Sequence, residues 1–137
     1  MEKLVISKRN YEEIIKYCKK GLPNEACGLM AGYQQKQEGV VSKVYLMTNI
    51  KKSPEEYLLD PEEQVKVFKE IEQLDLQLIS IFHSHPKTPC RPSIKDINDA
   101  YYPDVMYSIV SFLYEIEFRV FKIIEGNYRE VDLEINP

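Results

Sequence analysis

The sequence contains no long hydrophobic run. The apolar stretch near the N-terminus covers only Leu4 to Ile6, and no segment approaches the roughly 20 apolar residues of a transmembrane helix. Neither a membrane span nor a secretory signal peptide is therefore expected. Cysteine is also scarce: Cys18, Cys27 and Cys90 are odd in number and have no C-x-x-C spacing. This usage favours free thiols in a reducing compartment, so we expect a cytoplasmic protein.

The sequence also lacks an excess of positive charge. Its 18 lysines and arginines are scattered among 22 aspartates and glutamates, which gives a net charge of −4. This balance provides no attraction for nucleic acid or an anionic membrane, so neither is expected as a partner. Repeats, low-complexity segments and linkers are absent too. A chain of 137 residues that is 44% hydrophobic is predicted to form one domain, residues 1–137.

Hydrophobic periodicity predicts an α+β fold. Apolar residues at helical spacing, with start and stop signals, predict three helices at residues 7–21, 60–75 and 93–102. Strands are expected at residues 3–7, 26–35, 40–50, 55–60, 76–82, 105–113, 117–124 and 127–135. We expect these strands to form a mostly antiparallel sheet.

The helix predicted at residues 60–75 has the clearest signals. Asp60 is a typical N-cap, Pro61 suits the first helical position, and glutamates follow in the first turn. The expected buried face consists of Val65, Phe68, Ile71 and Leu74.

Histidine is the scarcest residue that could carry chemistry, and both histidines lie in the segment IFHSHPKTPCRPSIKD, Ile81–Asp96. On a strand, residues i and i+2 face the same side about 6.5–7 Å apart, so His83 and His85 can aim their imidazoles at one point. Zinc binds neutral imidazole nitrogens, and a catalytic zinc site usually has three protein ligands. An isolated H-x-H is a weak indication, because two histidines at a strand end are more often surface groups.

Asp96 is the candidate for a third ligand. The segment Ser93-Ile94-Lys95-Asp96 also has the S-x-x-D form of a helix cap, and the two roles are compatible. A helix N-terminus beside the histidine strand would hold the Asp96 carboxylate in the fixed geometry that a metal site requires. The three prolines between the histidines and Ser93 stiffen the connection.

A zinc hydrolase of this kind needs a general base, because zinc lowers the pKa of bound water only to about 7. Glu25 is the candidate, since it stands directly before the apolar strand-like run ACGLMAG, where an acid without a purpose would be costly to bury. The alternative is that Glu25 is merely an exposed loop residue, and from its position alone this alternative is favoured.

Taken together, these residues resemble the pattern of the JAMM (MPN-plus) metallopeptidases. The resemblance is carried by Glu25 in EACGLMAG, by HSHP, and by RPS followed by Asp96, with ten residues between His85 and Asp96. It implies a JAMM/MPN, cytidine-deaminase-like fold with a mixed, curved sheet flanked by helices. It also implies zinc on His83, His85 and Asp96, Glu25 as general acid and base, and Ser93 as an oxyanion donor.

The resemblance further implies a class of substrate. Members of this family cut after the diglycine tail of ubiquitin or ubiquitin-like proteins, and an extended tail is expected to pair with a strand edge near the zinc. Only eight residues separate Asp96 from Val105, so the chain resembles the compact prokaryotic form, which is associated with sulfur-carrier proteins. The alternative is a silent MPN-type scaffold that binds zinc or protein, although it would have no need of all five residues.

A zinc deaminase is a third possibility, and the ligands exclude it. Deaminases need H-x-E and P-C-x-x-C, whereas position 85 is histidine and Cys90 has no second cysteine after it. Cys90 can be a redox-sensitive neighbour of the site or an inert loop thiol, and the inert thiol is favoured.

Overall fold

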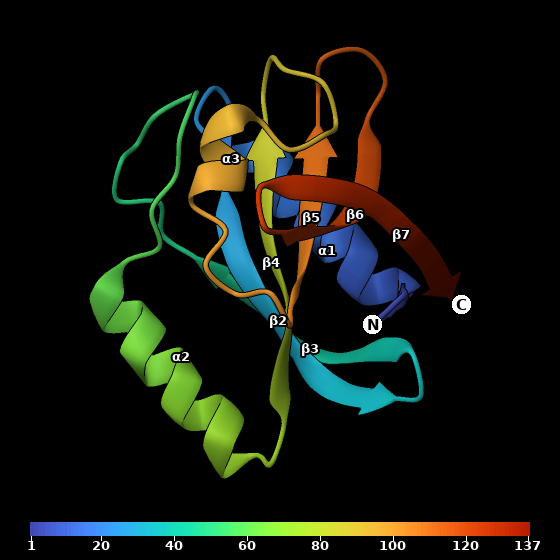
Figure 1. The fold of residues 1–137 in the computed structure, drawn as a ribbon. Helices are drawn as coiled ribbons and strands as arrows, with labels where there is room; N and C mark the ends of the chain where they lie inside the picture. The colour runs from blue at the N-terminus through green and yellow to red at the C-terminus, as the bar shows by residue number, and fades with distance from the viewer.

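Seven strands and three helices make up the computed structural model, which describes residues 1–137 (Figure 1). The strands are β1 Lys3–Ser7, β2 Cys27–Gln35, β3 Glu38–Met47, β4 Gln77–His85, β5 Met106–Ser111, β6 Glu117–Ile124 and β7 Asn127–Asn136. The helices are α1 Lys8–Gly21, α2 Pro61–Gln73 and α3 Ile94–Asn98. None of these helices combines the length and hydrophobicity needed to cross a membrane.

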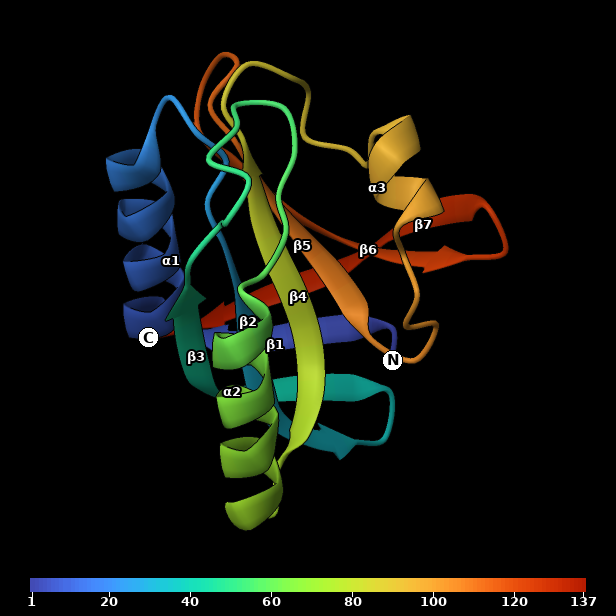
Figure 2. The ribbon, with the colours of Figure 1, turned by 90° about the vertical axis from the view of Figure 1, so that its left-hand side faces the viewer.

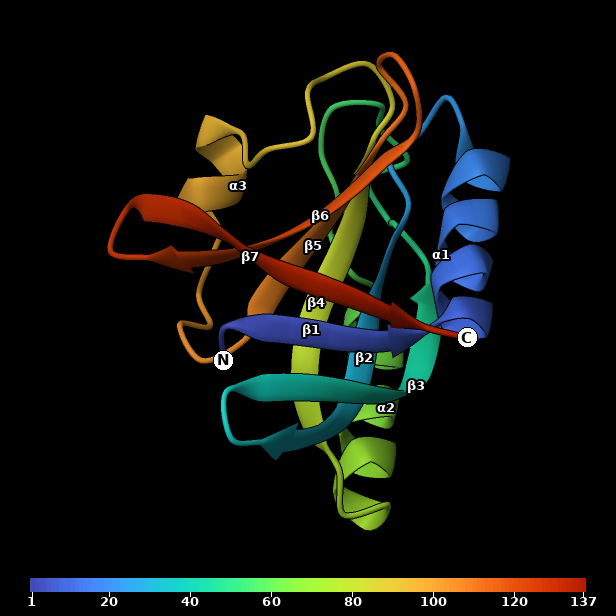
Figure 3. The ribbon, with the colours of Figure 1, turned by 90° about the vertical axis from the view of Figure 1, so that its right-hand side faces the viewer.

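The strands close into a barrel in the order β1-β3-β2-β4-β5-β6-β7. Strand β1 runs parallel to both β3 and β7, as Figure 3 shows, and β4 runs parallel to β5. The other four of the seven pairings are antiparallel, so the predicted α+β fold with a mixed sheet is confirmed. Strand β4, which carries the histidines, is paired on both sides, with β2 and β5, so it does not itself offer an edge for a substrate tail.

The strand predicted at residues 55–60 is absent, and a loop occupies this part of the chain. Its only ladder contact is an isolated bridge between Asn49 and Leu59. The Asn49 side chain accounts for the difference, because its Oδ1 accepts hydrogen bonds from the backbone N–H groups of Lys51 and Leu58. These backbone groups are therefore satisfied by a side chain rather than by a neighbouring strand.

Helix α2 lies along the outside of the barrel beside β4 (Figure 2). Its predicted start at Asp60 is confirmed, and Asp60 accepts a hydrogen bond from the Glu62 N–H. The predicted buried face is only half right. Phe68 packs against the second core cluster and Ile71 is buried, whereas Val65 and Leu74 are 55% and 48% exposed. Val67, which was not predicted, packs against the same cluster, so the buried face is rotated from the predicted one.

Helix α3 is shorter than predicted and ends at Asn98 rather than at residue 102. Pro103 disfavours helical backbone in the residue before it, and the Tyr102 N–H instead donates to the Tyr107 hydroxyl. Tyr101, which lies beyond the end of the helix, is 74% exposed.

Strand β4 separates two hydrophobic clusters. Phe82 belongs to the larger cluster, which includes residues of α1, while Ile81 belongs to the cluster covered by α2 and α3. Phe82 lies directly opposite Gly28 in the β2–β4 ladder. A Cβ atom at Gly28 would stand 2.3 Å from the Phe82 ring, so glycine is required for this packing. The close packing of Phe82 fixes the strand immediately before its two histidines.

Candidate metal centre

The last three residues of β4 place both histidines in the protein interior. His83 and His85 continue the face of Ile81 and are only 1% and 2% exposed. Ser84 is fully buried, and its hydroxyl accepts a hydrogen bond of 2.8 Å from the backbone N–H of Ala26. The prediction that the two imidazoles share one face is confirmed, and the alternative of two surface histidines is excluded.

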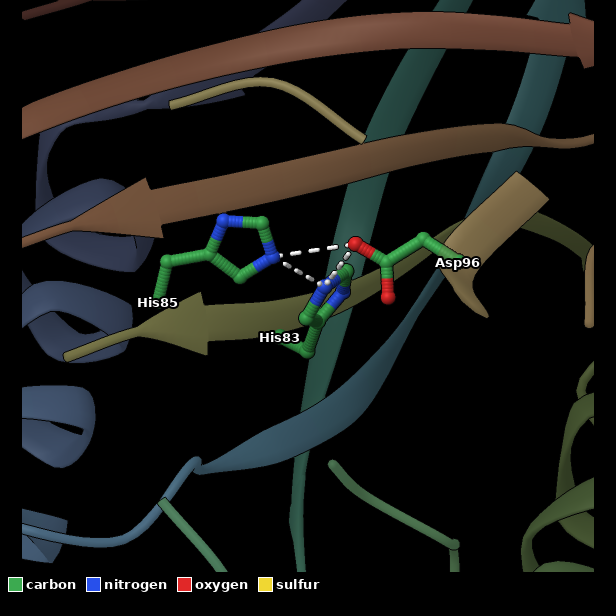
Figure 4. A group of neighbouring side chains, drawn as sticks. All are labelled: His83, His85 and Asp96. Atoms are coloured by element: carbon green, nitrogen blue, oxygen red, sulfur yellow. Dashed lines mark hydrogen bonds and ion pairs between the residues drawn. The ribbon is translucent and has the colours of Figure 1, made fainter. Parts of the chain in front are cut away.

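Asp96 completes a group of three donor atoms (Figure 4). Its Oδ2 atom lies 3.1 Å from Nε2 of His83 and 3.0 Å from Nε2 of His85, and the two Nε2 atoms are 3.0 Å apart. The capping box of α3 fixes the carboxylate. The Ser93 N–H donates to Oδ2 of Asp96, and the Asp96 N–H donates to the Ser93 hydroxyl, each over 3.0 Å.

The chemistry of these three atoms suits a cation. His85 donates its Nδ1 proton to the carbonyl of Pro89 over 2.8 Å, so in the neutral ring the lone pair is on Nε2, the nitrogen that faces the centre of the group. Zinc ligands at 2.0–2.1 Å in tetrahedral geometry would stand about 3.3 Å apart, close to the observed spacing. The group formed by His83, His85 and Asp96 could therefore hold a metal ion.

The ionisation of the three side chains agrees with this arrangement. Burial lowers the pKa of His83, which keeps its imidazole neutral. Burial also acts to lower the pKa of His85, but the hydrogen bonds with Asp96 and Pro89 outweigh it and the pKa is raised. Burial alone would raise the pKa of Asp96, yet the two histidines and the Ser93 N–H hold it well below its usual range. Asp96 is thus a carboxylate beside neutral or cationic partners.

Glu25 is buried, which excludes the exposed-loop alternative. It is 6% exposed, and its Oε1 atom has no hydrogen-bond partner among the protein atoms. Burial raises the pKa of Glu25 to about 8. The Ser84 N–H donates to the carbonyl of Ala26, so the contact between the two segments continues beyond the β2–β4 ladder toward Glu25. No hydrogen bond joins Glu25 to the three donors, although its charge and that of His85 influence each other.

The remaining two residues that the sequence singled out differ in accessibility. Ser93 is exposed at the start of α3, beside the Asp96 carboxylate. Cys90 is buried against Ile109 and Phe121, and its thiol donates to the Ile109 carbonyl. Burial raises the pKa of Cys90 to about 11, which disfavours the reactive thiolate and supports the alternative of an inert thiol.

Two residues near the centre were not identified from the sequence. Tyr57 stacks on His83, and the side-chain amide of Asn49 donates to the backbone carbonyl of Glu25 over 3.0 Å. A signal for Asn49 existed, because asparagine commonly bonds the backbone two residues further along the chain. Nothing in the local pattern places Tyr57 beside a histidine 26 positions later.

A cavity of about 300 Å³ opens beside Asp96. Its walls are rich in tyrosine and include Tyr57, Tyr101, Tyr102 and Tyr107. The cavity is mostly apolar and Asp96 is one of its lining residues, so a bound molecule could extend from the cavity to the donor group.

Comparisons with known proteins show which proteins this chain is similar to. Residues 7–122 match a family described as prokaryotic homologues of the JAB domain. The CysO-cysteine peptidase of Mycobacterium tuberculosis is 32% identical over 134 residues, which cover 96% of this chain and 90% of that protein. A probable TtuB-protein conjugate cleaving protease of Thermus thermophilus is 40% identical over 79 residues, 57% of this chain and 50% of that protein.

A solved structure shows that the likeness extends over the whole fold. The solution structure of the protein DSY2949 from Desulfitobacterium hafniense is 32% identical and superposes with a TM-score of 0.88. The match covers 97% of this chain and 92% of that chain.

Proposed function

Because the chain belongs to the family of prokaryotic homologues of the JAB domain, we propose that it is a zinc-dependent peptidase. Its reaction is the hydrolysis of the amide bond that follows the C-terminal diglycine of a ubiquitin-like protein, in particular a sulfur carrier. The observation that carries this proposal is the group of three donor atoms within 3.1 Å of one another, set in the interior beside an unpaired buried carboxyl. We propose that residues 1–137 form a single domain, because β7 pairs with β1 and so closes the barrel.

His83, His85 and Asp96 are the proposed zinc ligands. A zinc ion held there would supply Lewis acidity toward a carbonyl oxygen and would lower the pKa of water. The chain prepares these ligands by burial and hydrogen bonding. The Pro89 carbonyl fixes the His85 tautomer, and the Ser93 N–H holds the Asp96 oxygen.

Glu25 is the proposed general base and acid. Its raised pKa, about 8, lies close to neutrality, where a carboxyl can both take a proton from water and return one to a leaving amine. Its backbone is held on both sides, since the Glu25 N–H donates to the Ser53 carbonyl and the Glu25 carbonyl accepts from Asn49. The carboxyl can therefore move a proton without losing its position beside His85.

Ser93 is proposed to bind the oxyanion that forms during amide hydrolysis. Its hydroxyl oxygen accepts the Asp96 N–H, which leaves the hydroxyl proton free to be donated. The residue is exposed and adjacent to the ligand Asp96, so substrate can reach it. Removing one such donor in other hydrolases costs about 10²–10³-fold in kcat.

The substrate class rests on the relatives and on the family pattern. One relative is named a CysO-cysteine peptidase and another a probable TtuB-protein conjugate cleaving protease, and these names support a protein conjugate as the substrate. A diglycine tail has no side chains to obstruct its approach to the buried donors. The cavity beside Asp96 provides room for the neighbouring residues of the substrate.

Cleavage assays on purified diglycine-tailed proteins test this proposal. Each candidate carries a short C-terminal extension, and the products are measured by intact mass with and without a chelator. We expect products that end at the second glycine, and none after the metal is removed. Cleavage at another bond would contradict the substrate class, whereas cleavage that resists the chelator would contradict the role of the metal.

The alternative function is a scaffold that binds zinc or protein without hydrolysis. It is disfavoured by the unpaired, buried Glu25 carboxyl, which costs stability and serves no purpose in a scaffold. Bound zinc with no cleavage of any diglycine-tailed protein would favour this alternative.

A further inference from the structure

The two histidines of the centre are held in different ways. His85 is oriented by a hydrogen bond from Nδ1 to the Pro89 carbonyl. His83 has no equivalent bond, because its Nδ1 atom is buried with no protein hydrogen-bond partner. Histidine ligands of metals almost always donate from the second nitrogen, and that bond fixes the ring. The orientation of His83 therefore depends on another contact.

Tyr57 makes that contact. Its ring is stacked on the His83 imidazole, with centroids 4.5 Å apart and planes inclined by 20°. The His83 and His85 rings meet edge to face, with centroids 4.9 Å apart and planes inclined by 63°. A face-on contact of this kind restricts rotation of the imidazole about its side-chain bonds, which is the function that a hydrogen bond to Nδ1 would otherwise have.

The loop that carries Tyr57 is itself anchored to the centre. Asn49 is 8% exposed, and its amide donates to the carbonyls of Glu25 and Glu56 over 3.0 and 3.1 Å. Its oxygen accepts from the N–H of Leu58, the residue after Tyr57. One asparagine thus ties the backbone on both sides of Tyr57 to the backbone of Glu25.

We propose that Tyr57 is the positioning residue of His83. The face of its ring replaces the missing hydrogen bond and keeps Nε2 of His83 aimed at the donor group. The role rests on the proposed metal centre, and Tyr57 does not contact the reacting atoms. Asn49 fixes the loop so that the Tyr57 ring stays stacked on the His83 imidazole.

Metal affinity measures this role without reference to hydrolysis. The full chain and its variants are titrated with Co²⁺ and Zn²⁺ in competition with a chromogenic chelator, and the visible spectrum of bound Co²⁺ reports the ligand geometry. We expect Tyr57→Leu to bind either metal about 10–100-fold more weakly and to alter the Co²⁺ spectrum. Tyr57→Phe keeps the stacked ring, so its affinity and spectrum should match those of the unaltered chain.

Two controls separate positioning from general damage. Tyr101→Leu removes another tyrosine of the same cavity, one that does not stack on His83, and should leave affinity unchanged. Chemical denaturation of each metal-free variant shows whether the fold is intact. Unchanged affinity in a folded Tyr57→Leu variant would overturn the proposal for Tyr57 alone. Absence of metal binding by the unaltered chain would instead overturn the proposed function.

Discussion

Replacing Glu25 with glutamine is expected to lower kcat of the proposed hydrolysis by about 10²–10⁴-fold while one metal ion per chain is still bound. Glutamine keeps the size and the backbone contacts of Glu25 but can neither accept a proton from water nor deliver one to an amine. The carboxyl is not among the three converging donor atoms, so metal binding does not require it. Single-turnover kinetics and metal analysis on the same protein measure both quantities.

The neighbouring acid Glu55 provides a matched control. It is exposed, and its charge contributes to the raised pKa of Glu25. Glu55→Gln should leave kcat within a few-fold of the unaltered chain. A Glu25→Gln variant that retains most of the activity would contradict the assignment of Glu25 as the base.

The same substitution is expected to stabilise the metal-free chain at alkaline pH. The pKa of Glu25 is raised from its ordinary value of 4.5 to about 8, mainly by burial. Between these values the native chain keeps a proton that the unfolded chain releases, so the free energy of unfolding falls as pH rises and levels off above pH 8. Below pH 4.5 both states are protonated and the full stability is present.

Denaturation in the presence of a chelator tests this part of the prediction. Glu25→Gln should flatten the pH dependence between about pH 5 and pH 8 and should raise the stability at pH 9 by roughly 2–3 kcal/mol. This gain in stability is smaller than the free-energy cost of burying the Glu25 charge, because the buried glutamine amide also lacks hydrogen-bond partners. A variant with the same pH dependence as the unaltered chain would show that Glu25 ionises normally.

Zinc in thousand-fold excess over its Kd is expected to stabilise the unaltered chain by about 4 kcal/mol, since it binds the native state and not the unfolded one. For a chain of this size the corresponding rise in Tm is roughly 10–20 °C. His85→Ala should abolish both the rise and the stoichiometric binding, because it removes one of three donor atoms from the group. Thermal unfolding with graded zinc, followed by addition of chelator, measures the effect.

Asp99 serves as the control for the acidic side of the site. It lies just after α3, pairs with Lys95 and is not one of the three donor residues. Asp99→Asn should respond to zinc as the unaltered chain does. Equal stabilisation of His85→Ala and the unaltered chain would mean that zinc binds elsewhere.

The parts of the site that were predictable are those set by local spacing. His83 and His85 share a face because strand residues alternate, and Asp96 lies at a helix start because Ser93 is a capping residue. The burial of Glu25 could not be inferred, since it depends on the loop around residues 49–57 folding over it. Residues 55–60 were predicted as a strand because the hydrogen bonds that hold them in a loop come from Asn49, which also bonds the backbone of Glu25, 24 residues away. Such long-range bonds are not visible in the local sequence.

The closure of the barrel could not be predicted from local sequence patterns either. A run such as residues 3–7 predicts a strand but not its neighbours, and parallel pairing with β7 joins positions about 129 residues apart, as in Lys3 with Asp132. Long-range parallel pairs leave no turn or spacing signal in the sequence, in contrast to the β6–β7 hairpin.

The pairing of the first strand with the last also determines when the fold can be completed. During synthesis β1 emerges from the ribosome before the other strands of the barrel, and one of its two partners, β7, emerges after them. Until then β1 can pair only with β3, and its other side presents unpaired backbone groups. The nascent chain therefore carries an open sheet until β7 has been made, and closing the barrel requires a contact between strands that lie far apart in the sequence.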